Sequence, residues 1–203
     1  MFTFVTLVVL GILLGIVLMQ LFKKSTPPSA PVADLANLKV TDARAGDAIS
    51  ISGAGDNYTD LDFTADRLTH YDAGSRRWFE LSGPYLERRV AVRVMEGDDG
   101  VEVSLHSDPR KLTMEDLGLS EEDLAEMDER QNTADSFEFE GKVWLYLLSR
   151  EVRTDTAGFY YWEFREQAGK GMIAIRKAES EPFTITLYTG LNAADVTIYR
   201  PRA

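Results

Sequence analysis

The amino-acid sequence predicts a mainly β fold, made of two tandem antiparallel β-meander units that arise from an internal duplication. The first observation is a repeated pattern: Ala-Gly, three further residues and a Trp occur at Ala73–Leu81 and again at Ala157–Phe164. The second is that each copy is followed by short runs of alternating apolar and polar residues with turn residues between them, which is typical of strands. Because the turns separate the runs so closely, the strands are expected to pair antiparallel.

Residues 1–22 are predicted to form a single N-terminal transmembrane helix. The segment has no charged residue, and a helix of this length reaches about 33 Å, enough to cross the hydrocarbon core of a bilayer. Lys23 and Lys24 follow it directly, so the positive-inside rule predicts an inner (cytoplasmic) membrane protein whose soluble domain faces the cytoplasm. An exported domain behind an uncleaved or late-cleaved anchor is the alternative. Gly11 and Gly15 form a G-x-x-x-G pair that would allow homo-oligomers, although glycine is also common in membrane helices generally.

Residues 23–37 are rich in proline and are expected to form an extended tether to the first β-unit, residues 38–107. In that unit, alternation predicts a series of short strands with a clear hairpin turn at Glu96–Gly100. The strands are expected at Ile49–Ile51, Leu61–Tyr71, Arg77–Leu81, Val90–Met95 and Val101–His106.

Residues 108–135 break the strand pattern and are predicted to form a short acidic helical connector. Ser120 and the three acids after it resemble a capping box, and acids are favourable at the positive end of a helix. Leu124 and Met127 give this helix only a narrow apolar stripe, so it is expected at the edge of the domain. The second β-unit, residues 136–203, follows, with strands expected at Phe137–Glu140, Val143–Arg153, Phe159–Glu166, Met172–Lys177, Phe183–Thr189 and Val196–Tyr199.

The charge balance argues against nucleic-acid binding, because the formal net charge is −11 and phosphate recognition needs lysine and arginine. A cationic partner fits such a chain better. The absence of cysteine excludes disulfides, thiolate metal ligands and cysteine nucleophiles. His70 and His106 are isolated in the sequence and are expected on strand surfaces, so no metal site, cofactor or catalytic residue is predicted.

Four aromatic residues are the predicted binding residues: Phe159, Tyr161, Trp162 and Trp78. Successive strand residues alternate between faces, so Phe159 and Tyr161 are expected on the face opposite Trp162 and Tyr160. Exposed aromatic side chains of this kind are favoured as interface anchors. The alternative is that both faces are covered, one by the first unit and one by the acidic helix, with each Trp filling the core of its sheet.

Glu80 and Glu163 follow Trp78 and Trp162 at different distances, so they point to opposite faces relative to the two rings. This difference in spacing does not predict the matched geometry that a catalytic carboxylate pair needs. Each glutamate is therefore expected to pair with an arginine across a strand in a solvated position.

Several short motifs mark the beginning, the middle and the end of the β-rich part. They are Gly46-Asp47, Trp78-Phe79-Glu80, Phe137-Glu138-Phe139-Glu140-Gly141, Tyr161-Trp162-Glu163-Phe164 and Ile198-Tyr199-Arg200-Pro201. Together they resemble the bacterial family known as domain of unknown function four-one-seven-eight, over residues 38–201 and without the membrane helix. The resemblance implies a β-rich domain without known catalytic residues, often encoded near phage shock protein A homologues, spermidine-synthase-like proteins and small membrane proteins.

These features lead to two hypotheses about function. The first is a membrane-anchored, non-enzymatic binding or scaffold module, attached to the membrane through residues 1–22, that recruits a soluble protein partner in an envelope-maintenance or membrane-stress system. The second is an enzyme, or an accessory subunit of one, acting on a cationic small molecule such as a polyamine. The acidic charge is compatible with both, but no catalytic constellation in the sequence supports the second.

Overall fold

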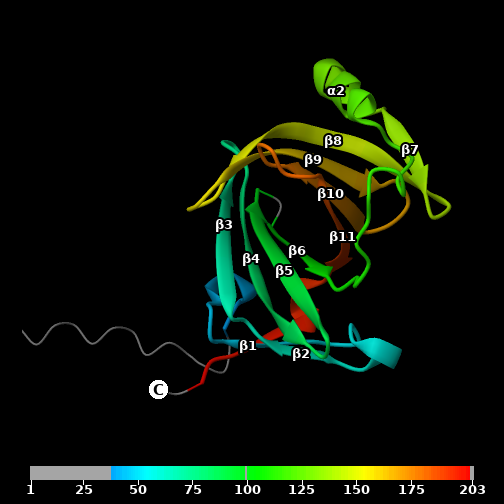
Figure 1. Ribbon diagram of the computed structural model, residues 1–203. Coiled ribbons are helices and arrows are strands. Elements are labelled where there is room, and N and C mark those ends of the chain that lie inside the picture. Colours follow the sequence, from blue (N-terminus) through cyan, green and yellow to red (C-terminus); the bar gives the residue numbers. More distant parts are fainter. Residues whose placement is uncertain (1–37, 99, 202–203) are drawn as a thin grey trace, which may run out of the picture. The chain divides into compact units, whose positions relative to one another are not determined.

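The structure, a computed structural model, describes residues 38–98 and 100–201, and these residues are mainly β (Figure 1). The strands are β1 (Ala48–Ile51), β2 (Leu61–Thr64), β3 (Arg67–Asp72), β4 (Arg77–Tyr85), β5 (Arg88–Gly97), β6 (Gly100–His106), β7 (Ser136–Phe139), β8 (Lys142–Arg153), β9 (Gly158–Glu166), β10 (Gly171–Lys177), β11 (Thr184–Leu191) and β12 (Val196–Tyr199). The α-helix is α2 (Glu121–Arg130), and three 3-10 turns are η1 (Val40–Asp42), η2 (Asp56–Tyr58) and η3 (Ala193–Asp195).

The predicted transmembrane helix over residues 1–22 and the tether over residues 23–37 lie outside the described residues. Among the residues that are described, no helix has the length and apolar character needed to cross a membrane.

The strands form two antiparallel sheets. The larger has nine strands in the order β3-β4-β5-β6-β11-β10-β9-β8-β7, and its first strand also pairs with β8 through Asp72 and Arg153. The sheet therefore curls until β3 meets β8, which encloses an interior face (Figure 1). The smaller sheet has the order β12-β1-β2.

Two four-stranded meanders, β3 to β6 and β8 to β11, make up most of the larger sheet. They meet where β6 pairs with β11, so the two predicted units share one sheet instead of forming two. The smaller sheet also mixes the predicted units, since β12 from the end of the chain pairs with β1 from its beginning. β1 and β7, which open the two predicted units, do not occupy corresponding places, because β7 pairs with β8 in the larger sheet while β1 belongs to the smaller one.

The predicted single strand Leu61–Tyr71 is wrong, because the chain changes sheets in the middle of it. β2 belongs to the smaller sheet and β3 to the larger one. At the bend, the Ala65 N–H donates to the Asp47 carbonyl at 2.9 Å, and the Asp66 N–H donates to the Ser82 carbonyl at 3.0 Å. These hydrogen bonds satisfy backbone groups at the bend that are not paired in either sheet. The alternation of Leu61, Phe63 and Ala65 is broken at Arg67, and the predicted strand ran across this break.

Helix α2 forms where the sequence predicts it and is closed by a capping box. The Asp123 N–H donates to the Ser120 hydroxyl at 3.1 Å, and the Ser120 N–H donates to the Asp123 carboxylate at 2.8 Å. Leu124 and Met127 are its buried residues. They pack on the outer face of the β8–β11 half, together with Trp162, so the narrow apolar stripe is confirmed as the contact.

Three apolar clusters hold the domain together. The first lies between the smaller sheet and the outer face of β4, β5 and β6, and is formed largely of valine, isoleucine and leucine. The second lies under α2. The third fills the interior of the curled sheet with aromatic and methionine side chains, namely Tyr71, Trp78, Met95, Tyr161, Met172 and Tyr188 together with smaller residues. Unlike the first two, the third surrounds charged groups.

We expect Gly83→Ala to destabilise the domain by about 1–3 kcal/mol, as overpacking does. A Cβ atom at Gly83 would lie 2.1 Å from the Thr64 carbonyl oxygen and 2.8 Å from the Phe63 ring, where β2 crosses β4. Gly158→Ala is the matched control, because its Cβ would approach only the Val152 carbonyl, at 3.8 Å. Urea unfolding of both variants measures the difference. Equal stability of the two would show that β2 does not approach β4 so closely.

Candidate functional site

Two buried carboxylates lie inside the curled sheet. Glu80 on β4 is 9% exposed and Glu163 on β9 is 1% exposed. Each follows an inward-pointing aromatic residue by two positions, Trp78 in the first case and Tyr161 in the second, so alternation along the strand turns both glutamates inward. A buried carboxylate is stable only with a cationic partner and further hydrogen bonds.

Arg176 is the partner of Glu80, with 2.6 Å between its Nη2 and the Glu80 Oε1. The Tyr188 and Tyr71 hydroxyls donate to the same carboxylate at 2.7 and 2.8 Å. Arg176 also donates to both hydroxyls at 3.2 Å and lies 4.9 Å from the centre of the Tyr71 ring. Both oxygens of Glu80 are therefore satisfied without water.

Arg93 is the partner of Glu163, with 2.9 Å between its Nη2 and the Glu163 Oε2. The Tyr161 hydroxyl donates to the same oxygen at 2.9 Å. Two further guanidinium groups approach the other oxygen, Arg165 at 3.4 Å and Arg76 at 3.5 Å. Three arginines thus converge on one carboxylate.

The two ion pairs are exchanged between the two meanders. Glu80 of the first meander pairs with Arg176 of the second, and Glu163 of the second pairs with Arg93 of the first. The expectation of solvated pairs is wrong, since both carboxylates are buried. Glu80 does lie directly opposite Arg93 in the β4–β5 ladder, but its charged partner comes from β10. Only the closure of the sheet brings these partners together.

The charges in this network are fixed at neutral pH. Burial alone would raise the pKa of Glu80, but the charge of Arg176 and the tyrosine hydrogen bonds hold that pKa below its ordinary value. Burial acts on Glu163 in the same way, and its surrounding arginines likewise keep its pKa lowered. Burial raises the pKa of Tyr71 to about 12. Each of these pKa shifts moves away from neutrality, whereas a general acid or base needs a pKa near the working pH.

Of the predicted binding residues, Trp78, Tyr161 and Phe159 face this interior. Trp78 and Tyr161 are buried with their ring centres 5.3 Å apart, and Phe159 is half-buried, 6.2 Å from the Tyr71 ring. The prediction that Phe159 and Tyr161 share a face opposite Trp162 is confirmed. Their expected exposure is wrong for Tyr161, because the first meander covers that face, as the alternative interpretation held.

Trp162 faces the other side and lies under α2, with its indole N–H donating to the Leu124 carbonyl at 3.3 Å. Trp78 and Trp162 are therefore on corresponding strands but opposite faces, and Tyr161 is the residue whose position matches Trp78. The Trp78 indole N–H has no hydrogen-bond partner in the part of the chain that is described.

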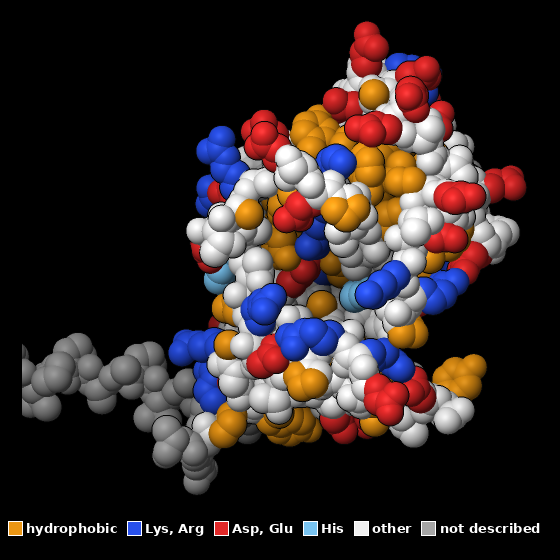
Figure 2. Space-filling model, in the orientation of Figure 1, with side chains coloured by type: hydrophobic (Ala, Val, Ile, Leu, Met, Phe, Trp, Pro, Cys, Tyr) orange, Lys and Arg blue, Asp and Glu red, His pale blue; other side chains and the backbone are white. Residues whose placement is uncertain are grey.

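A groove runs between α2 and β9, and we call it the α2 groove. Its volume is about 260 Å³. Its apolar floor holds Trp162, Phe183 and Tyr160, and the Tyr160 hydroxyl donates to Asp128 on the helix at 2.7 Å. Lys177 lies 4.6 Å from the Phe183 ring. Figure 2 shows acidic atoms on the helix and apolar atoms gathered beneath it.

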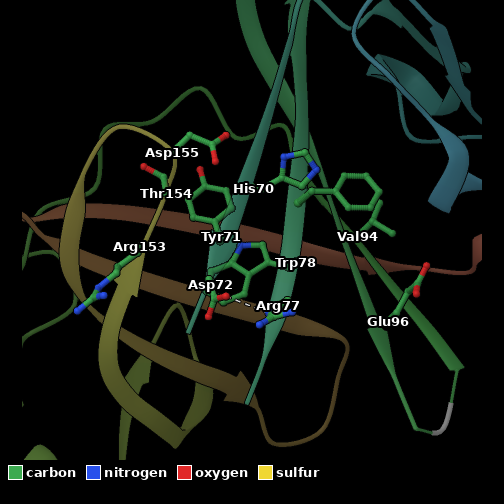
Figure 3. A pocket seen from close by; sticks show the side chains of 11 residues that line it. His70, Tyr71, Asp72, Arg77, Trp78, Val94, Glu96, Arg153, Thr154 and Asp155 are labelled. Carbon is green, nitrogen blue, oxygen red and sulfur yellow. Dashed lines mark hydrogen bonds and ion pairs between the residues drawn. The ribbon is translucent and has the colours of Figure 1, made fainter. Parts of the chain in front are cut away.

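A larger cavity of about 730 Å³ lies near the seam between β3 and β8 (Figure 3). His70, Phe79 and Val94 form a row across β3, β4 and β5 along it, because they are opposite one another in the ladders. Its charged residues largely neutralise one another, as Asp72 pairs with Arg77 at 2.9 Å and lies opposite Arg153. Trp78 lines this cavity, but the cavity concentrates neither charge nor nucleophilic side chains.

Two of the family-like motifs meet at the ends of the domain. Arg200 donates to both oxygens of the Asp47 carboxylate, at 2.9 and 2.8 Å, and we call this pair the terminal clamp. The hydrogen bond from Arg200 lowers the pKa of Asp47. The motif residues Gly46-Asp47 and Arg200 lie far apart in the sequence, and their structural role is to join the two ends of the domain.

The two histidines lie apart from each other. His70 is exposed on β3, and His106 ends β6 with its Nδ1 3.0 Å from the Leu187 carbonyl. Within residues 38–98 and 100–201, no group of three or more histidine, aspartate or glutamate residues is placed to hold a metal ion.

No family model matches the chain, and comparison with curated proteins and with solved structures finds no match either. The family resemblance of the motifs therefore stays a prediction.

We expect Arg176→Met to lower the free energy of unfolding by about 3–5 kcal/mol near neutral pH, because it leaves Glu80 buried without a cationic partner. Adding Glu80→Gln removes that charge, so the double variant should be more stable than the single one. Chemical denaturation of the three proteins tests this order. Equal stability of the single and double variants would show that Glu80 does not carry a buried charge.

The same variants should differ in pH dependence. In the wild type the lowered pKa of Glu80 means that its contribution to stability is present above the unfolded pKa and is lost as the pH falls through the folded one. In Arg176→Met the pKa of Glu80 should instead lie above the unfolded value, so the penalty shrinks as the pH falls from about 7 to about 5. The double variant should lack this recovery.

Proposed function

We propose that this protein is a membrane-anchored, non-enzymatic binding module of the cytoplasmic membrane, held there by residues 1–22. It recruits a soluble protein partner on the cytoplasmic side. The observation that carries the proposal is the α2 groove, where an aromatic floor lies beside a helix with six acidic residues and one basic residue. An apolar centre with a charged rim is the usual composition of a protein contact.

The interior network supports binding over catalysis. Its carboxylates are each held by arginine and tyrosine, and their pKa values lie below the ordinary range. Both buried acids, Glu80 and Glu163, are already neutralised by arginines. These ion pairs give little support to an interior site for a cationic small molecule such as a polyamine. An interior of this kind serves as a rigid support for a surface site.

The groove favours one kind of partner. Its volume of about 260 Å³ is below the usual range for small-molecule sites, and it suits one large apolar side chain of a protein segment. The acids Glu121 and Asp128 line it, and charge complementarity favours basic residues in that segment. The partner is therefore a basic segment with an apolar anchor.

Ala125→Lys should weaken binding of a basic amphipathic peptide roughly tenfold, because it obstructs the groove and reduces its acidity, and tenfold corresponds to about 1.4 kcal/mol. Ala125 is exposed on α2, so the fold should be retained. Ala168→Lys adds the same charge in the exposed β9–β10 turn and is the control. Fluorescence anisotropy with the full-length protein in detergent, using arginine-leucine and glutamate-leucine peptides, measures the effect. Equal binding of both peptides, or no loss in Ala125→Lys, would contradict the proposal.

A carboxyl-terminal fusion should report a cytoplasmic location, because Lys23 and Lys24 follow the predicted membrane helix. Alkaline phosphatase, which is active only after export, should be silent in that fusion. Replacing both lysines by glutamine should weaken the orientation bias. Strong phosphatase activity of the unmodified fusion would place the domain, and therefore its partner, on the other side of the membrane.

A further inference from the structure

A second cleft lies beside the short ladder of β6 and β11, and we call it the arginine cleft. The two strands pair over three residue pairs, from Leu105–Thr189 to Val103–Leu191. The cleft has a volume of about 350 Å³. That volume lies in the range of small-ligand sites.

The cleft gathers positive charge in a strongly acidic chain. Arg93, Arg165 and Lys170 line it, and Arg93 is only 3% exposed. The two acids that line it are already paired: Glu102 with Arg165 at 2.7 Å, and Glu166 with Lys142 at 3.1 Å. The lining residues and their ion-pair partners comprise four basic and three acidic groups, the third acid being Glu163.

The excess of positive charge at the cleft is larger than this count of basic and acidic groups suggests. Glu163 is shared by Arg93, Arg165 and also Arg76, so counting Arg76 gives five basic groups against three acidic ones. Lys170 donates to the Asn192 side chain at 3.1 Å and has no carboxylate within 4.0 Å among the described residues. A chain with a net charge of −11 thus keeps surplus cations at one place.

Buried donors at the cleft lack acceptors. The Nε atoms of Arg93 and Arg165 are both buried and have no hydrogen-bond partner within the described part of the chain. Leaving such a donor unsatisfied costs stability, and more so when the group is charged. The guanidinium fork of arginine matches the oxygens of a carboxylate or phosphate. The exposed cationic groups of the cleft, on Arg165 and Lys170, therefore favour an oxyanion.

The remaining lining is apolar or small. Met95, Met172, Val103 and Leu191 line the cleft, together with three glycines, Gly169, Gly171 and Gly190, at which a Cβ atom would lie 2.4–2.8 Å from Glu166 or Lys170. A ligand could place a short hydrocarbon body against the methionines while its charged end meets the arginines.

We propose that the arginine cleft binds a small organic anion, with a carboxylate or phosphate end and a short apolar body. Arg165, whose side chain is 40% exposed, and Lys170 hold the oxyanion, the buried Arg93 adds its positive charge beneath them, and the two methionines contact the body. This site is separate from the α2 groove, so it stands whether or not the groove binds a peptide.

Isothermal titration of the full-length protein in detergent with hexyl phosphate, hexanoate and hexylammonium tests the charge requirement. The two anions should bind and hexylammonium should not, and added salt should weaken binding because the attraction is electrostatic. Inorganic phosphate alone should bind more weakly than hexyl phosphate, since it lacks the apolar body. Preference for hexylammonium, or equal binding of all three, would overturn the proposal.

Variants locate the site. Val101 lines the rim and is 40% exposed, so Val101→Glu should fold while repelling the anion, and Val101→Gln is its neutral control. Lys170→Gln should weaken binding of hexyl phosphate roughly tenfold, the change expected for one hydrogen bond to a charged group. Lys111→Gln, at an exposed position outside both sites, should leave it unchanged. Wild-type affinity in both Val101→Glu and Lys170→Gln would place the anion elsewhere and contradict the assignment.

Discussion

The exchange of two ion pairs between the meanders is the constraint on which the rest of the structure depends. Removing a charge from water costs several kcal/mol, and that cost is offset only when the opposite charge and further hydrogen bonds are in place. Glu80 needs Arg176 from the second meander, and Glu163 needs Arg93 from the first. Each meander therefore supplies the arginine nearest to the other's buried glutamate. Closing the two halves on each other brings these partners together.

Closure of the sheet also determines which surfaces are available for binding. The interior is filled by charged and aromatic side chains that are held by one another, so the two sites proposed above lie outside this network or at its edge. The residues that line the α2 groove carry a net negative charge, and those that line the arginine cleft carry a net positive one.

The sequence predicted the features that depend on neighbouring residues. The strands of the second half, the hairpin at Glu96–Gly100 and the capping box at Ser120 follow from alternation and local hydrogen bonding, and the structure contains them. The seam at Asp72–Arg153 depends on residues far apart along the chain, so no local pattern marked it, whereas the break in alternation at Arg67 did mark the change of sheet and was passed over. The aromatic site was misjudged for a related reason. Aligning the repeats on Trp78 and Trp162 shifts the faces by one residue, and a one-residue shift reverses every side chain of a strand.

The terminal clamp gives the domain a mechanical property. Asp47 precedes β1 and Arg200 follows β12, and in the register of the two strands Ala48 lies opposite Tyr199. The chain therefore enters and leaves the domain on adjacent strands at the same end of the smaller sheet. Tension arriving from the amino-terminal side would first act on η1, which packs against β12 and β5, and then on β1, whose hydrogen bonds to β12 and β2 and the clamp itself oppose the displacement. The load would therefore be shared between the smaller sheet and β5 of the curled sheet.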